Sequence, residues 1–258
     1  MKHIVLTRFS LFHGNKWPMN SPMWSAMDID EKDLENEDLR NQAYMQYLYS
    51  DERLAYKWKS LKHLTIPYTL KAMDKVEDAE WWIFVSPSPN IMPVHIRQKL
   101  EDITWFDKRI KIFEIDIRER NLGVEIKSLI KKNVQGRYCT YRIDDDDGFH
   151  EDLMIDIQNL AEMKPDPFVY CSQWGAKCQI HDDGQIEIGN LWKHWSQHAI
   201  GLACVDDNIF SLGNHGNISS KFPDLEIVHD QIKKVGFLLN CEPKFTASRR
   251  VFGDPKSL

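Results

Sequence analysis

Residues 137–149 read RYCTYRIDDDDGF, an alternating apolar and polar run that leads into four consecutive aspartates and a glycine. The alternation over residues 138–143 predicts a β-strand, whose successive side chains point to opposite faces. Asp144 to Asp147 follow this strand directly. Four adjacent carboxylates repel one another, so a stable fold needs a reason to keep them at the end of a strand. That reason is a metal ion, a solvated turn or an acid/base site.

Segments with strand character alternate with helical segments on both sides of this run. WWIFVSPSP (81–89) is a short apolar strand ended by two prolines, and RIKIFEIDI (109–117) is an alternating strand. Repeated alternation of this kind indicates an α/β sheet covered by helices. The predicted strands are 3–12, 81–89, 109–117 and 138–143. The predicted helices are 50–64, a second helix or helical turn from Pro67 to about Lys75, 94–102, 123–133 and 149–163.

The last third of the chain changes character. FVYCSQWGAKCQIHDDGQIEIGNLW (168–192) places an Asp-Gly pair between two alternating segments, 176–181 and 185–188. An Asp-Gly pair between alternating runs is a strong signal for a β-hairpin. Residues 201–205 predict one more short strand. The tail after residue 242 is basic, has no clear periodicity and is expected to be a loop or a docked terminal segment.

Composition restricts the class of protein. The chain has 258 residues, a net charge of −6 and 42% hydrophobic residues, which is typical of a globular protein that buries a sizeable core. An acidic chain without a basic stripe is a poor candidate for binding duplex nucleic acid or anionic membranes. We expect neither a signal peptide nor a transmembrane segment. The five cysteines include no CxxC pair, which favours reduced thiols in a cytoplasmic protein.

The spacing of the aspartates predicts which of them could bind a metal ion together. In an extended strand, Asp144 and Asp146 point to one face and Asp145 and Asp147 to the other. Two oxygen ligands from one short segment suit a hard divalent ion such as Mg²⁺ or Mn²⁺, whose open positions substrate phosphates can fill. The end of a strand in an α/β sheet is also where such sheets bind ligands.

Two other sites with acidic motifs do not fit the flanking residues. An EF-hand calcium loop aligned on Gly148 has Ile143 at its first position and Met154 at its twelfth, where it needs Asp and Glu. A phosphatase that forms an aspartyl-phosphate needs a DxDx[TV] motif after its first strand, whereas this run is in mid-chain and ends in glycine. A solvated acidic turn remains open.

Four stretches of the chain together resemble a bacterial rhamnosyltransferase family, whose members are glycosyltransferases of GT-A type. They are HIVLTRFS (3–10), DERLAYKWKSLKHLTIPYTLKAM (51–73), EWWIFVSPSPNIMP (80–93) and RIDDDDGF (142–149). The resemblance covers roughly residues 3–160. It implies a GT-A-like mixed sheet flanked by helices in one glycosyltransferase domain, residues 1–258. The nucleotide-sugar-binding part is about 1–165, and the acceptor side is about 166–258.

The resemblance also implies roles for the acidic run. Asp144 and Asp146 would be the DxD pair that holds Mn²⁺ or Mg²⁺ on the diphosphate of a nucleotide-sugar donor. Asp147 would orient the sugar or stabilise the loop, and Asp145 would be variable and partly exposed. Arg142 would be a counter-charge to the cluster. Arg8, at the end of the first strand, would contact the nucleotide.

Transfer to a glycan acceptor also needs a group that accepts the proton of the attacking hydroxyl. Asp147 and Asp183 are the candidates, although a place in the hairpin turn is the better explanation of Asp183. His215, between glycines and asparagines, is a candidate third metal ligand, and Arg249 is a candidate phosphate contact. The predicted function is metal-dependent transfer of a sugar, rhamnose by the family's name. A binding protein without catalysis and a metal-dependent phosphohydrolase are the alternatives.

Overall fold

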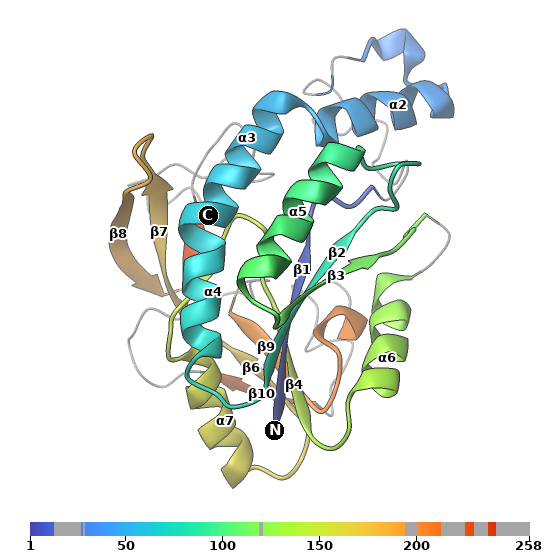
Figure 1. Ribbon diagram of the computed structural model, residues 1–258. Coiled ribbons are helices and arrows are strands. Elements are labelled where there is room, and N and C mark those ends of the chain that lie inside the picture. The colour runs from blue at the N-terminus through green and yellow to red at the C-terminus, as the bar shows by residue number, and fades with distance from the viewer. Residues whose placement is uncertain are drawn as a thin grey trace.

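The computed structural model describes residues 1–12, 27, 29–118, 121–193, 201–212, 225–229 and 237–240. Its centre is a seven-stranded sheet in the order β10-β6-β9-β4-β1-β2-β3 (Figure 1). Strand β9 is antiparallel to both of its neighbours, and the other neighbouring strands are parallel. The bounds are β1 (Lys2–Arg8), β2 (Ala79–Val85), β3 (Ile110–Glu114), β4 (Tyr138–Arg142), β6 (Phe168–Cys171), β9 (Leu202–Val205) and β10 (Glu226–His229).

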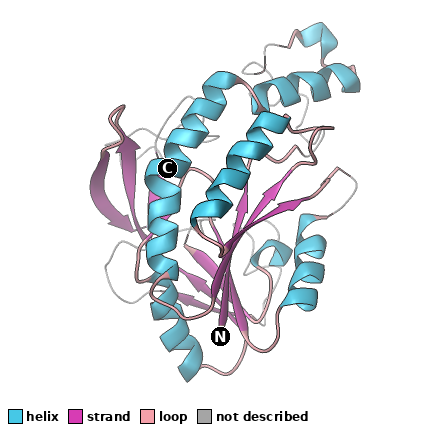
Figure 2. Ribbon diagram, in the orientation of Figure 1, coloured by secondary structure: helices cyan, strands magenta, loops and turns pink. Residues whose placement is uncertain are grey.

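Helices cover both faces of this sheet (Figure 2). Along β1, Val5 belongs to the core beneath α3, α4, α5 and α7, whereas Ile4 and Leu6 belong to the core beneath α6. A strand that is apolar on both faces is typical of a parallel sheet buried between helix layers. The helices are α2 (Glu37–Leu48), α3 (Asp51–Ser60), α4 (Ile66–Met73), α5 (Val94–Phe106), α6 (Leu122–Asn133) and α7 (Leu153–Met163). The predicted α/β class, with a mixed sheet flanked by helices, is therefore confirmed.

A second, four-stranded sheet lies beside the first, in the order β5-β11-β7-β8. Its strands are β5 (Gly148–Phe149), β7 (Trp174–Ile180), β8 (Ile186–Lys193) and β11 (Phe237–Asn240). Strands β7 and β8 form the predicted hairpin, and Gly184 in its turn has a φ of 85°, which glycine adopts without strain. Ala176, Cys178 and Leu238 pack against Leu64, so this sheet is attached to the helix layer.

The two helices predicted over residues 50–64 and 67–75 are observed as one continuous helical segment with one irregularity. Helices α3 and α4 are joined by η2 (Leu61–Thr65), a single π-helical turn. Pro67 lies just after this turn, and because it has no N–H to donate it interrupts the regular hydrogen-bond ladder of the helix at this point. Single π turns inside α-helices frequently accompany functional sites. This one directly follows the residues of α3 that contact the acidic run.

A buried histidine makes the fold sensitive to acid. His3 in β1 is fully buried, with Nδ1 2.7 Å from the Tyr141 hydroxyl and Nε2 3.1 Å from Oε1 of Gln158. Burial lowers the pKa of His3 from 6.5 to about 4, so the ring is neutral in the folded protein at neutral pH. The unfolded chain takes up this proton first, so the stabilisation is present above pH 6.5 and is lost as the pH falls. Between pH 7 and 5 we expect His3 to lower the free energy of unfolding by about 2 kcal/mol.

Urea unfolding of the wild type, of His3→Gln and of His95→Gln at the two pH values measures this effect. His95 is exposed, so its variant should keep the acid sensitivity of the wild type. The His3→Gln variant should lose less stability between pH 7 and 5. Equal losses in all three proteins would contradict this account of His3.

Candidate active site

The four aspartates form a tight turn at the carboxyl end of β4. Strand β4 ends at Arg142, and the N–H of Asp147 donates to the carbonyl of Asp144 at 3.3 Å before β5 begins at Gly148. The turn thus connects the central sheet to the second sheet. The predicted strand alternation, with Asp144 and Asp146 on one face, is wrong for these residues, because the extended backbone ends before them.

Asp145 and Asp146 share one buried lysine. The ammonium of Lys57 in α3 lies 2.6 Å from Oδ1 of Asp145 and 2.9 Å from Oδ2 of Asp146. The Tyr56 hydroxyl donates to the same Oδ2 of Asp146 at 3.2 Å. Asp145 is only 4% exposed, so the prediction that it is partly exposed is wrong. Lys57 stabilises the turn because it offsets the repulsion between two neighbouring carboxylates.

The charges in this buried group are strongly coupled. Burial by itself would lower the pKa of Lys57, but Asp145 and Asp146 outweigh burial, and the pKa lies above its ordinary value. Burial raises the pKa of Asp145, against the attraction of Lys57. Among the described residues, the second oxygen of Asp145 is buried without a hydrogen-bond partner. The lysine is therefore the main compensation for two buried carboxylates.

Asp147 connects the turn to the second sheet. It is 1% exposed, and its Oδ1 accepts the backbone N–H of Asn240 in β11 at 3.0 Å. The side-chain amide of Asn240 in turn donates to the Tyr56 hydroxyl at 3.1 Å and to Oγ of Ser60 at 3.0 Å. These contacts agree with the second of the two roles predicted for Asp147, which is stabilising the loop.

Asp144 is the most accessible carboxylate of the turn. Its side chain is 32% exposed, and its Oδ1 lies 3.5 Å from a terminal nitrogen of Arg142 and 3.7 Å from one of Arg8. Arg8 and Arg142 end the adjacent parallel strands β1 and β4. The structure therefore brings Arg8, Arg142 and the acidic turn together, and Arg142 lies where a counter-charge was expected.

The predicted candidates of the hairpin lie elsewhere. Asp183 is exposed in the turn between β7 and β8, where its carboxylate accepts the N–H of Gln185 at 2.9 Å. Its neighbour Asp182 pairs with Lys59 at 2.9 Å. No contact found within the described ranges joins Asp183 to the acidic turn. His215 and Arg249 lie outside the described residues, so the structure says nothing of their predicted roles.

The donor atoms of the turn suit a hard metal only as a partial set. Among the described residues, no group of three or more His, Cys, Asp and Glu side chains is placed to hold a metal ion. Mg²⁺ and Mn²⁺ sites often use one or two carboxylates and complete the shell with water and substrate phosphates. Lys57 and Tyr56 both bind Oδ2 of Asp146. The other oxygen of Asp146 and the carboxylate of the partly exposed Asp144 are therefore the donors that fit such an ion.

Sequence reasoning missed Tyr56, Lys57, Ser60 and Asn240. For Lys57 a signal exists, since it lies three residues after Leu54 and four before Leu61, on the face of the helix that is otherwise apolar. A lysine on such a face needs a buried anion as its partner. For Asn240 no local signal exists, because its contacts depend on a strand pairing between distant segments.

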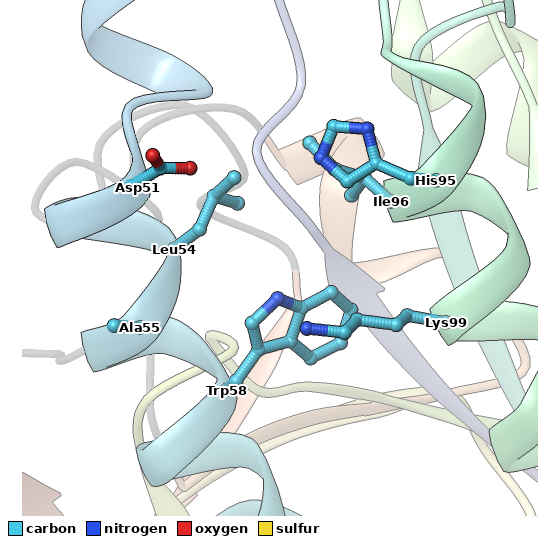
Figure 3. Close-up of a pocket in the computed structure, with 7 residues that line it drawn as sticks. All are labelled: Asp51, Leu54, Ala55, Trp58, His95, Ile96 and Lys99. Atoms are coloured by element: carbon cyan, nitrogen blue, oxygen red, sulfur yellow. The ribbon is translucent and has the colours of Figure 1, made fainter.

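A separate cavity of ≈ 180 Å³ lies between α3 and α5 (Figure 3). The ammonium of Lys99 lies over the Trp58 ring, 5.6 Å from its centroid. Trp58 follows Lys57 in the sequence, but Lys57 does not line this cavity, so the cavity is separate from the acidic turn. Its lining residues are Asp51, Leu54, Ala55, Trp58, His95, Ile96 and Lys99.

No helix within the described residues is long and apolar enough to cross a membrane.

Among solved structures, the chain is similar to a "putative glucose-1-phosphate thymidylyltransferase" of Bacillus anthracis, with 11% identity, a TM-score of 0.45 and coverage of 100% of this chain and 98% of that one. It is also similar to TarS of S. aureus, residues 1–349, with 9% identity, a TM-score of 0.39 and coverage of 95% and 62%. A complex of that TarS fragment with UDP-GlcNAc matches at 8% identity and a TM-score of 0.37, with coverage of 93% and 58%. Likeness at this level carries no inference about activity.

No curated protein matches the chain. The family comparison is more informative, because it extends well beyond the stretches that suggested a resemblance, to residues 2–232. The matching family is described as "putative rhamnosyl transferase", and the chain therefore belongs to this family of glycosyltransferases.

Proposed function

We propose that the protein is a metal-dependent glycosyltransferase that moves a sugar from a nucleotide-sugar donor to a glycan acceptor at the acidic turn. The family description makes rhamnose the first sugar to test. The observation that carries the proposal is the placement of Asp144, beside Arg8, and of Asp146, held by Lys57, in the turn at the carboxyl end of a central strand. Ligands of open α/β sheets bind beyond the carboxyl ends of their strands.

The reaction requires charge stabilisation and one proton transfer. The bond between the sugar's anomeric carbon and the diphosphate oxygen breaks, and a bond to the acceptor oxygen forms. Negative charge grows on the leaving diphosphate, while the acceptor hydroxyl loses its proton to a base. Asp147 and Asp183 stay our predictions for that base. The exposed carboxylate of Asp183 is open to solvent, whereas that of Asp147 is engaged by Asn240.

Mn²⁺ or Mg²⁺ would be held by Asp144 and Asp146, with His215 as a proposed third ligand. The ion would stabilise the negative charge of the diphosphate as a Lewis acid. Lys57 and Tyr56 fix Oδ2 of Asp146 from within the protein, so its other oxygen keeps one orientation. Arg8, and Arg249 from the tail, would contact the nucleotide part of the donor.

A donor screen tests this function. The protein is incubated with Mn²⁺, a panel of UDP-, GDP- and dTDP-sugars and saccharide acceptors, and mass spectrometry detects the new glycoside and the released nucleoside diphosphate. We expect one donor to be consumed with formation of a glycoside. Donor binding without turnover would instead support a binding protein. Release of nucleoside monophosphate or phosphate without a glycoside would support a phosphohydrolase.

Removing the metal should stop the transfer. With the active donor, we expect EDTA to lower the rate by roughly 100-fold or more, because a Lewis acid contributes several kcal/mol to the transition state. Excess Mn²⁺ should restore the rate. The initial rate of glycoside formation is measured before EDTA, after EDTA and after Mn²⁺ is added back. An unchanged rate in EDTA would show that lysine and arginine side chains of the protein stabilise the leaving diphosphate without a metal.

A further inference from the structure

Phe210 provides a rigid apolar surface next to the acidic turn. It lies in η3 (Ile209–Leu212), a short helix that is held at three points. Oδ1 of Asn208 accepts the N–H of Phe210 at 3.0 Å, and the amide of Asn208 donates to the carbonyl of Gly123 in α6 at 2.8 Å. The N–H of Ile209 donates to Oγ1 of Thr140 in β4 at 2.9 Å. The backbone that carries Phe210 is thus fixed relative to β4 and α6.

Two guanidinium groups pack against this ring. The guanidinium carbon of Arg8 lies 5.5 Å from the centroid of Phe210, and that of Arg142 lies 5.3 Å from it. Contacts of this kind hold arginine side chains in place while their N–H groups stay available. Because β1 and β4 are adjacent and parallel, both arginines lie at the carboxyl ends of the strands, on the same side of the sheet's end.

The two arginines are incompletely neutralised. Both point a terminal nitrogen at one oxygen of Asp144, at 3.5 and 3.7 Å, which is long for a guanidinium–carboxylate hydrogen bond. Nε of Arg142 is buried and, among the described residues, has no hydrogen-bond partner. Within the described part of the chain, Asp144 therefore lies beside two guanidinium groups, one of which keeps a buried donor without a hydrogen bond.

We propose that Arg8 and Arg142 form a clamp for the diphosphate group of the donor, and that Asp144 occupies this clamp only in the free protein. This rests on the proposed function and assigns the group that binds the leaving diphosphate. Two planar guanidiniums offer paired N–H donors that match phosphate oxygens, and a diphosphate supplies the negative charge that Asp144 alone lacks. When the diphosphate binds, Asp144 is released from the arginines.

Calorimetric titration without metal tests the clamp. Inorganic pyrophosphate, UDP, GDP and dTDP are titrated in EDTA into the wild type, Arg8→Gln, Arg142→Gln and Asp144→Asn. We expect each arginine variant to weaken pyrophosphate binding at least about 10-fold, which is the typical effect of losing a charge-assisted hydrogen bond. The Asp144→Asn variant should bind pyrophosphate more tightly than the wild type, because the competing carboxylate is neutralised.

Arg109→Gln is the matched control. Arg109 has a similarly exposed side chain, 34% against 40% for Arg8. It precedes β3, at the amino ends of the parallel strands, where it pairs with Asp74 and Asp107. Its variant should bind pyrophosphate like the wild type. Should Arg142→Gln fail to fold, the half-exposed Arg8 and Asp144 variants still decide the question.

The possible outcomes separate the clamp from the proposed function. Wild-type affinity in Arg8→Gln, or weaker metal-free binding in Asp144→Asn, would overturn the clamp even if the donor screen detects sugar transfer. The expected pattern of affinities without sugar transfer to any acceptor would support the clamp and overturn the proposed function. Absence of binding of all four ligands to the wild type would overturn the clamp, and the donor screen would then judge the proposed function alone.

Discussion

Replacing Lys57 by methionine should lower the free energy of unfolding by about 3–5 kcal/mol, the usual cost of removing one partner of a buried ion pair. The ammonium lies 2.6 Å from Asp145 and 2.9 Å from Asp146, and all three side chains are buried. Without it, two adjacent carboxylates are left in the interior with no cation between them. Urea unfolding at pH 7 measures the loss.

Lys59→Met is the control for this prediction. Lys59 lies on the same helix but pairs with the fully exposed Asp182, and an exposed pair contributes little to stability. A rescue experiment separates charge from packing. Adding Asp145→Asn and Asp146→Asn to Lys57→Met should recover part of the loss, because the uncompensated charges are then removed. Equal stability of Lys57→Met and Lys59→Met would show that Lys57 does not hold the turn.

Replacing Asp146 by asparagine should lower the rate of sugar transfer roughly 1000-fold, since several kcal/mol of charge stabilisation at the diphosphate are lost. The amide has nearly the shape of the carboxylate, so the loss reports on charge. The measurement is the initial rate of glycoside formation with the donor found by the screen. It is made on protein whose folded state is verified by circular dichroism.

Asp145→Asn is a closely matched control for Asp146→Asn. Each variant removes one of the two carboxylates that bind Lys57, so their losses of stability should be similar. Only Asp146 is proposed to face the donor, and the folded Asp145→Asn protein should keep most of its rate of transfer. Equal losses of rate in both variants would mean that the acidic turn acts only through the stability of the fold.

Local sequence signals predicted the elements that local chemistry controls. The strand at residues 81–85 is apolar throughout and ends at a Ser-Pro-Ser-Pro stretch, and the structure has it as β2. The hairpin follows from an Asp-Gly turn between alternating segments. Strands β10 and β11 are only four residues long, which is too short for a periodicity, and their pairing with β6 and β7 joins distant parts of the chain.

The acidic turn shows the same division at the level of single residues. Its place at the end of a strand was predictable, because the alternation in YCTYRI stops where the aspartates begin. The exposure and the contacts of each carboxylate were not predictable, because the prediction assumed an extended backbone where the chain turns. Asp145 was expected to be partly exposed but is buried, since α3 brings Lys57 against the turn.

The sequence by itself determined the α/β class, the position of the acidic run after a central strand, the hairpin and the resemblance that the family match confirmed. These depend on side-chain periodicity, turn chemistry and the order of motifs, all of which are local in the chain. Only the tertiary structure decided that Lys57 binds Asp145 and Asp146. It also decided that Arg8, Arg142 and Phe210 meet at the carboxyl ends of the central strands. Those contacts join residues 68 to 202 positions apart (Arg142–Phe210 and Arg8–Phe210), and their geometry exists only once the strands have paired and the helices have packed.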